Sequence, residues 1–200
     1  EEEDMPKRVV IALGGNAIQE IGKPATSEAQ LDACRKTAVS IADIYERGYQ
    51  VVVAHGNGPQ VGNILLQSEA ADSSRTPAMP FDVCGAMSQG EIGYWLQQSI
   101  GDELRGRGKD IPVCTVLTQV IVEKDDDAFK NPTKPIGPFY TREAALKMES
   151  EKGYVMKEDA GRGYRRVVAS PAPVYVVEKD AIKRLVENGV LTIAVGGGGI

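Results

Sequence analysis

The chain has 200 residues, of which 42% are hydrophobic, and this suits one large domain or a domain with a small inserted lobe. Its 28 acidic and 23 basic residues give a net charge of -5, which argues against a general nucleic-acid surface. The longest apolar runs are strand-sized and residues 1–4 are all acidic, so we expect a cytoplasmic protein without a membrane span or secretory signal.

The first elements along the chain predict a βαβ unit. An apolar strand ends at Leu13, and a helical repeat of apolar residues follows from Thr26 to Gly48, with Thr26 or Ser27 as the N-cap. The next apolar strand covers Gln50 to Ala54. Since one helix joins the two strands, they should lie parallel in one sheet.

Both of these strands end in a glycine-rich junction. Gly14, Gly15 and Asn16 follow the first strand, and the second leads into Gly56, Asn57 and Gly58. Adjacent glycines let backbone N–H groups turn toward a ligand, and a helix that follows adds its positive N-terminal end. Two such junctions with matched asparagines therefore favour binding of a phosphate or carboxylate.

Several other kinds of site find little support. His55 is the single histidine, so a histidine-based zinc site or a Ser-His-Asp triad has very few candidate residues. No Walker A spacing occurs, so phosphate chemistry of the P-loop kind is not expected. Cys34, Cys84 and Cys114 are widely separated, and we expect them to be free thiols in packed elements. We expect no metal bound by the protein itself.

Two helices should follow the second junction. Pro59 fits the first turn of one helix, and Val83 to Leu104 reads as a second, long helix with unusually many glycines and other small residues. The small residues have two interpretations. They allow close packing of the helix on a strand in the core, or they form a subunit interface with Tyr94 and Trp95 as anchors.

The remaining chain contains a predicted insertion and a return to the main pattern. Pro112 to Glu123 reads as a third β segment, and residues 124–166 read as a protruding lobe, whose residues 128–140 are too proline-rich for a central strand. Strand Val174 to Val177, helix Glu178 to Asn188 and strand Val190 to Val195 then lead to a third glycine cluster, Gly196 to Gly199. This order predicts an α/β protein, a three-layer α/β/α sandwich with a mainly parallel sheet and an inserted lobe.

Four segments of the sequence together resemble carbamate kinase, a family within the amino-acid kinase superfamily. They are Ala12 to Ala17, His55 to Gly62, Asn131 to Gly137 and Glu158 to Arg165. The first two occur in looser form across the superfamily, whereas the last two are specific to carbamate kinases and their close relatives. The resemblance spans residues 8–200.

The resemblance implies reversible phosphoryl transfer, in which ADP and carbamoyl phosphate give ATP and carbamate, with Mg²⁺ on the nucleotide and no tightly bound cofactor. Lys134 matches the catalytic lysine of the family, and Gly15 and Asn16 are the other catalytic candidates. The implied substrate-binding residues are Gly14, Gly15, Asn16, Gly56, Asn57, Gly58 and Lys134, and the implied nucleotide-binding residues are Gly196, Gly197 and Gly198. A homodimer is also expected from the resemblance. Lys130 is a weaker candidate for the role of Lys134.

The chain departs from the family in one respect. Carbamate kinases continue well past the third glycine cluster into a part that binds most of the nucleotide. We therefore expect the natural protein to be longer, and the 200 residues alone to form ATP poorly. The predicted divisions are residues 1–123 for carbamate and carbamoyl phosphate, residues 124–166 for a lid-like lobe, and residues 167–200 for the return to the sheet.

Three rival functions remain open. One is another superfamily enzyme that acts on a different small acid. The second is a module or inactive fragment that binds carbamoyl phosphate without turnover. The third is a nicotinamide-dependent oxidoreductase, which the displaced glycine fingerprint at Gly56 to Gly62 disfavours. For the arginines 162, 165 and 166, the sequence supports two roles equally, a self-bonded turn and contacts from a lid to phosphate.

Overall fold

A computed structural model of the protein describes residues 7–20 and 22–194. Within these residues the chain forms two compact units. The first unit contains residues up to 56, residues 89–118 and residues from 177 onward, and the second contains residues 57–88 and 119–176. The predicted division at residues 123 and 166 stays a prediction.

The first unit is built on a four-stranded sheet. Its strands are β1 (Arg8–Leu13), β2 (Gln50–His55), β9 (Leu191–Ile193) and β3 (Val113–Thr115), and they lie side by side in this order. All neighbouring pairs are parallel. In the register of β1 and β2, Leu13 lies opposite His55, so the two glycine-rich junctions begin at the same end of neighbouring strands.

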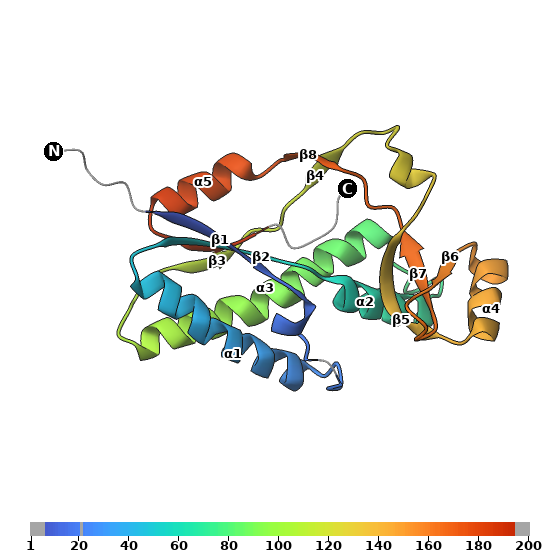
Figure 1. The fold of residues 1–200 in the computed structure, drawn as a ribbon, viewed down its shortest axis with the longest axis horizontal. Coiled ribbons are helices and arrows are strands. Elements are labelled where there is room, and N and C mark those ends of the chain that lie inside the picture. The colour runs from blue at the N-terminus through green and yellow to red at the C-terminus, as the bar shows by residue number, and fades with distance from the viewer. Residues whose placement is uncertain (1–6, 21, 195–200) are drawn as a thin grey trace. The chain divides into compact units, whose positions relative to one another are not determined.

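Helices cover both faces of this sheet. Figure 1 shows α5 (Lys179–Glu187) on one side, and α1 (Ser27–Glu46) with the later part of α3 (Phe81–Gly106) on the other. The apolar residues of α1 and α3 form one buried core with those of β1, β2 and β9. The predicted N-cap is confirmed, because the Thr26 hydroxyl accepts a hydrogen bond from the Ala29 N–H. The sandwich with a parallel sheet is confirmed as well.

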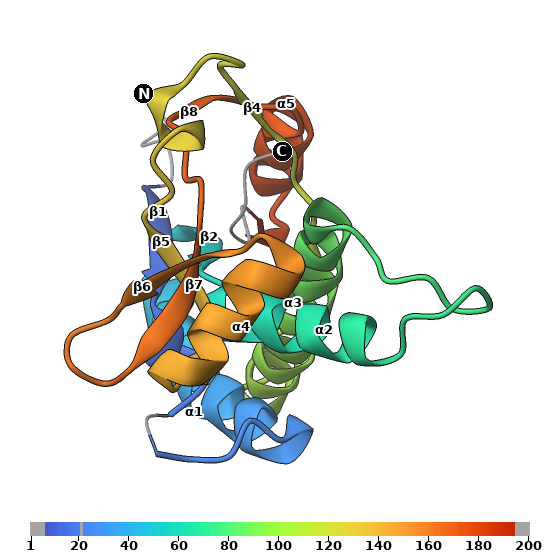
Figure 2. The ribbon, with the colours of Figure 1, turned by 90° about the vertical axis from the view of Figure 1, so that its right-hand side faces the viewer.

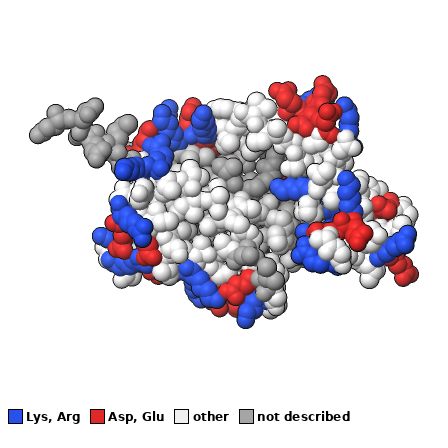
Figure 3. Space-filling view, in the orientation of Figure 1, with Lys and Arg blue, Asp and Glu red and all other residues white. Residues whose placement is uncertain are grey.

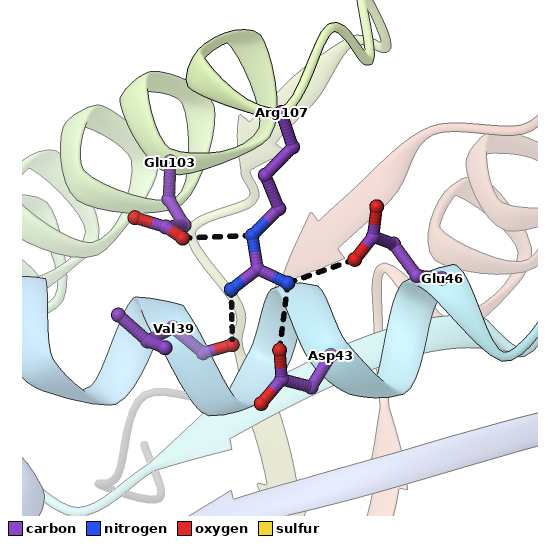
Figure 4. A network of polar contacts seen from close by, with 5 residues as sticks. All are labelled: Val39, Asp43, Glu46, Glu103 and Arg107. Atoms are coloured by element: carbon purple, nitrogen blue, oxygen red, sulfur yellow. Dashed lines mark hydrogen bonds and ion pairs between the residues drawn. The ribbon is translucent and has the colours of Figure 1, made fainter.

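Arg107 joins the ends of α1 and α3 (Figure 4). Its guanidinium donates to the carboxylates of Asp43 at 2.6 Å, Glu46 at 2.9 Å and Glu103 at 2.7 Å, and also to the Val39 carbonyl oxygen. These hydrogen bonds raise the pKa of the guanidinium above its ordinary value. An arginine is suited to this place because its planar fork of N–H groups reaches several acceptors at once.

The second unit combines α2 (Gly58–Ala70) and the first part of α3 with two small antiparallel sheets. One sheet pairs β4 (Val120–Val122) with β8 (Pro173–Val176). The other has the order β5 (Lys134–Tyr140), β7 (Tyr164–Val168), β6 (Val155–Glu158). Figure 2 shows α4 (Arg142–Lys152) lying against this second sheet. A short helix, η2 (Asp127–Phe129), precedes β5.

One predicted element in this part of the chain needs correction, and one is confirmed. Residues 112–123 do not form one strand, because β3 and β4 belong to different sheets and are separated by residues 116–119. The proline-rich segment forms no central strand, as predicted, because its strand β5 lies at the edge of its sheet and, among the described strands, pairs with β7 alone. An edge position tolerates proline because the missing N–H can face away from the neighbouring strand.

The glycines do not interrupt α3, which is continuous over 26 residues. At Gly93 the core interpretation is right, because an added Cβ would lie 2.3 Å from the Thr115 Cγ2 atom of β3. Thr115 also donates a hydrogen bond to the Gly93 carbonyl oxygen at 3.1 Å. Of the two aromatic candidates, Trp95 lies in the core at 6% exposure, whereas Tyr94 is 66% exposed.

Replacement of Gly93 by alanine should destabilise the first unit by about 1–3 kcal/mol, because the new methyl group overlaps with Thr115. Gly90 is the matched control on the same helix, since an added Cβ there has no described atom within 4 Å. Gly90→Ala should stabilise by up to about 1 kcal/mol through helix propensity. Urea unfolding of both variants tests the difference, and equal effects would contradict close packing at Gly93.

The three cysteines are free thiols, as expected, and burial raises the pKa of Cys34 to about 12.

On the face that Figure 3 shows, acidic and basic side chains occur in mixed groups, one of them around η2. Among the described helices, none combines the length and apolar character that a membrane span requires.

Candidate functional site

The two glycine-rich junctions begin side by side in the first unit, at Gly14 and Gly56. The Gly56 N–H donates to the Leu13 carbonyl oxygen at 3.1 Å, so Gly14 and Gly15 begin beside Gly56. All three glycines are exposed. Directly after the first junction lies η1 (Gly15–Ala17), a single 3₁₀ turn, and the helix predicted to follow, α1, begins only at Ser27. Three residues align too few peptide dipoles to act as a helix end.

Thr37 holds this turn in place and was not predicted from the sequence. Its hydroxyl, on α1, donates to the Ala17 carbonyl oxygen at 2.8 Å. The bond joins residues 20 positions apart, so no local sequence pattern indicates it. Through it the crossover helix anchors the segment that carries Gly15.

The second junction does lead into a helix N-terminus, that of α2. Asn57 is the N-cap residue, and Pro59 lies in the first turn as predicted. The Asn57 side chain is buried, and its Nδ2 donates to the Ser88 Oγ atom at 2.8 Å. Among the described residues it makes no capping bond to α2. The positive end of α2 is therefore without a side-chain cap.

His55 ends β2 just before this junction. Its ring Nδ1 lies 3.0 Å from the Gly56 carbonyl oxygen, to which an Nδ1–H donates. Burial lowers the pKa of His55 below its ordinary value of 6.5, and the bond to Gly56 opposes this shift only in part. The ring therefore stays neutral in the folded protein at neutral pH.

A pH dependence of stability follows from this lowered pKa. Below about pH 6.5 the unfolded chain binds a proton at His55 more readily than the folded chain, so the free energy of unfolding should fall on acidification. The fall should level off below the folded-state pKa. Unfolding measured at pH 7.5, 6.5 and 5.5, beside His55→Asn, tests this. An identical pH dependence in the variant would assign the effect to other groups.

In the second unit, β5 passes over the N-terminal half of α2. A Cβ added at Gly58 would lie 3.9 Å from the Pro135 carbonyl oxygen, and one at Gly62 only 2.2 Å from the Gly137 Cα atom. Gly137 itself has a φ of +70°, a conformation that suits glycine. Lys134 is the exposed first residue of β5. Lys134 therefore begins the strand whose next residue, Pro135, approaches Gly58, the residue after Asn57.

Two bonds fix the chain just before Lys134. The Thr133 N–H donates to the Val168 carbonyl oxygen at 3.2 Å, and the Lys157 ammonium donates to the Pro132 carbonyl oxygen at 2.8 Å. Lys157 lies on β6, which is separated from β5 by β7, so sequence reasoning had no signal for it. The other lysine candidate, Lys130, pairs with Asp127 at 3.1 Å.

The arginine-rich segment forms mostly internal contacts. Arg162 and Arg165 both pair with Asp159 and lie over the Phe139 ring. Arg166 lies over the Tyr154 ring at 3.6 Å, and its Nη1 atom is buried without a hydrogen bond among the described residues. These contacts match the self-bonded interpretation for Arg162 and Arg165.

Four of the predicted site residues lie wholly or partly outside the described structure. Gly196, Gly197 and Gly198, predicted to bind the nucleotide, lie outside the described residues. Asn16 lies in η1, and its backbone alone is described. In the part of the chain that the structure describes, no three His, Cys, Asp or Glu side chains gather in a way that would hold a metal ion.

Comparisons with known proteins confirm the similarity to carbamate kinases. The carbamate kinase of Clostridium perfringens is 58% identical over 195 residues, which cover 96% of this chain and 62% of that protein. That of Pyrococcus horikoshii is also 58% identical, over 98% of this chain and 63% of its own. The chain thus spans less than two thirds of the length of these relatives.

Solved structures and the sequence model of a protein family agree with this similarity. The carbamate kinase from Giardia lamblia bound to citric acid superposes with a TM-score of 0.92 at 45% identity, over 98% of this chain and 63% of that one. The same enzyme bound to AMP-PNP gives a TM-score of 0.85. The sequence model of the Amino acid kinase family matches residues 7–200. The chain therefore belongs to the amino acid kinase family.

Proposed function

We propose that this chain is the carbamoyl phosphate-binding part of a carbamate kinase, which transfers a phosphoryl group between carbamoyl phosphate and ADP. One observation carries the proposal. Lys134 begins the strand that packs against Gly58 and Gly62 of α2, so a flexible cation lies on the same element that contacts the uncapped positive end of a helix. Such an arrangement suits a phosphate in transfer.

In the proposed reaction, the bond between phosphorus and the carbamate oxygen breaks while a terminal phosphate oxygen of ADP bonds to phosphorus. The bond-breaking electron pair stays with carbamate. Lys134 neutralises charge on the transferred oxygens, and backbone N–H groups of Asn57 and Gly58 orient them. Little covalent help from protein groups is needed, because such transfer depends mainly on position and electrostatics.

Gly14, Gly15 and Asn16, together with Gly56, keep their predicted substrate-binding role as a proposal, with Gly15 and Asn16 also as catalytic candidates. ATP and ADP are the proposed nucleotides, supported by the relative that binds AMP-PNP. Mg²⁺ enters with the nucleotide, where it neutralises phosphate charge. Gly196 to Gly198 remain proposed nucleotide contacts, and we propose a cytoplasmic homodimer.

The test is coupled ATP formation from carbamoyl phosphate, ADP and MgCl₂. Since the chain covers 62% of the Clostridium perfringens enzyme, it is assayed alone and joined to the part of that enzyme that it does not cover; this hybrid is called the extended protein. We expect the extended protein to form ATP and the chain alone to bind carbamoyl phosphate with little turnover. An extended protein that is folded but inactive with carbamoyl phosphate, and active with another acyl phosphate, would contradict the proposal.

A further inference from the structure

We propose that Ser88 is a positioning residue, which holds the Asn57 side chain away from α2 and so keeps the first turn of this helix open for the anionic group of the substrate. The inference rests on the proposed function, because it assigns a substrate anion to that turn. It adds a residue on α3 that touches no substrate and acts through Asn57.

The hydrogen bonds at Ser88 have a fixed direction. The Ser88 hydroxyl donates its single proton to the Gly85 carbonyl oxygen at 2.6 Å. Its oxygen is therefore left as an acceptor, and Asn57 Nδ2 donates to it at 2.8 Å. Ser88 is 0% exposed and Asn57 is 6% exposed, so water cannot readily replace either partner. The serine thus determines which end of the Asn57 amide points toward α3.

This orientation has a consequence for α2. Asparagine is among the best N-cap residues, because its side-chain oxygen accepts from the N–H groups of the first helical turn. Asn57 occupies the N-cap position, yet among the described residues its side chain makes no such bond. The bond to Ser88 therefore opposes a local preference of the sequence. A ligand anion gains the helix end that the side chain would otherwise cap.

A purely structural role for the bond makes a different prediction. If the bond only joins α2 to α3, its removal leaves a buried N–H group without a partner and lowers stability. If it positions Asn57, its removal lets the side chain turn and cap α2, so stability is retained while anion binding is lost. The two roles thus differ in how stability and affinity change together.

The first experiment compares Ser88→Ala with Ser99→Ala in the 200-residue chain. Ser99 is a matched control, because it is a buried serine on the same helix, at 3% exposure, and its Oγ atom has no hydrogen bond partner among the described residues. The probe is acetyl phosphate, in which a methyl group replaces the amino group of carbamoyl phosphate, and binding is measured by calorimetry. Ser88→Ala should weaken binding about tenfold or more. Its Tm should stay within about 2 °C of the parent, and Ser99→Ala should change neither value.

A double-mutant cycle tests whether Ser88 acts through Asn57. Asn57→Ala removes the side chain that could cap α2, so acetyl phosphate binding should be retained. In that background Ser88→Ala should no longer weaken binding, if it acts through Asn57. An equal loss of binding from Ser88→Ala with and without the Asn57 side chain would overturn the positioning role alone. If the unsubstituted chain fails to bind acetyl phosphate, the proposed function is contradicted instead.

A spectroscopic measurement needs no ligand. In the parent chain, the Asn57 side-chain NH₂ protons should exchange slowly with solvent, and Ser88→Ala should move their NMR signals and speed their exchange. Ser99→Ala should leave these signals in place. Unchanged Asn57 signals in Ser88→Ala, or a large loss of Tm together with any loss of affinity, would overturn the proposal.

Discussion

Gly62→Ala should unfold the second unit or separate β5 from α2, and it should lower the free energy of unfolding by at least about 3 kcal/mol. A Cβ at this position would lie 2.2 Å from the Cα atom and 2.4 Å from the N atom of Gly137, and both are backbone atoms that no side-chain rotation can move away. Relief requires separation of α2 from β5. Since β5 begins at Lys134, we also expect ATP formation by the extended protein to fall by about 10²-fold.

Gly85→Ala is the matched control for this prediction. Gly85 is a helical glycine of the same unit, and an added Cβ there has no described atom within 4 Å. It should retain activity and gain up to about 1 kcal/mol of stability from helix propensity. Urea unfolding and the coupled assay measure both effects. A stable and active Gly62→Ala variant would show that β5 does not approach α2 closely.

Lys134→Ala should lower ATP formation by the extended protein by about 10²- to 10³-fold, the cost of removing one charge that stabilises the transferred oxygens. Lys134 is exposed, so its loss should change the urea midpoint little. The loss should appear mainly in kcat if the lysine acts on the transition state more than on the bound substrate.

Lys130→Ala serves as the comparison, because Lys130 lies four residues earlier and pairs with Asp127 on the surface. Its removal should change kcat less than about twofold, as expected for an exposed ion pair. The reverse outcome, with Lys130 essential and Lys134 dispensable, would transfer the proposed role to Lys130.

Local patterns in the sequence were sufficient for most of the first unit. The helical repeat after Thr26 and the apolar strand from Gln50 predicted α1 and β2, and their βαβ connection predicted the parallel pair of β1 and β2. These elements have strong periodicity and clear caps, and short connections restrict how they can be joined. The helix N-terminus after the second junction was also predictable, because Pro59 suits a first helical turn.

The parts that were wrong or missed depend on contacts between distant residues. The prolines of residues 128–140 correctly excluded a central strand, but the sequence does not indicate that β5 pairs with β7 at a sheet edge. Gly62 and Gly137 are 75 positions apart, and no local pattern indicates that their backbones touch. Ser88 and Lys157 are common residue types in a helix and a strand. Only the fold brings them to Asn57 and Pro132.

In the proposed site, Asn57, Gly58 and Lys134 bind one phosphate-bearing ligand. The most direct measurement is a titration of the isotope-labelled 200-residue chain with acetyl phosphate, followed by NMR of assigned backbone amides. We predict that the signals of Gly58 and Lys134 shift together along one saturation curve. In Lys134→Ala, the Gly58 signal should reach saturation only at a higher acetyl phosphate concentration. Shifts that saturate at different concentrations, or that leave Gly58 and Lys134 unchanged while other signals move, would contradict a shared site.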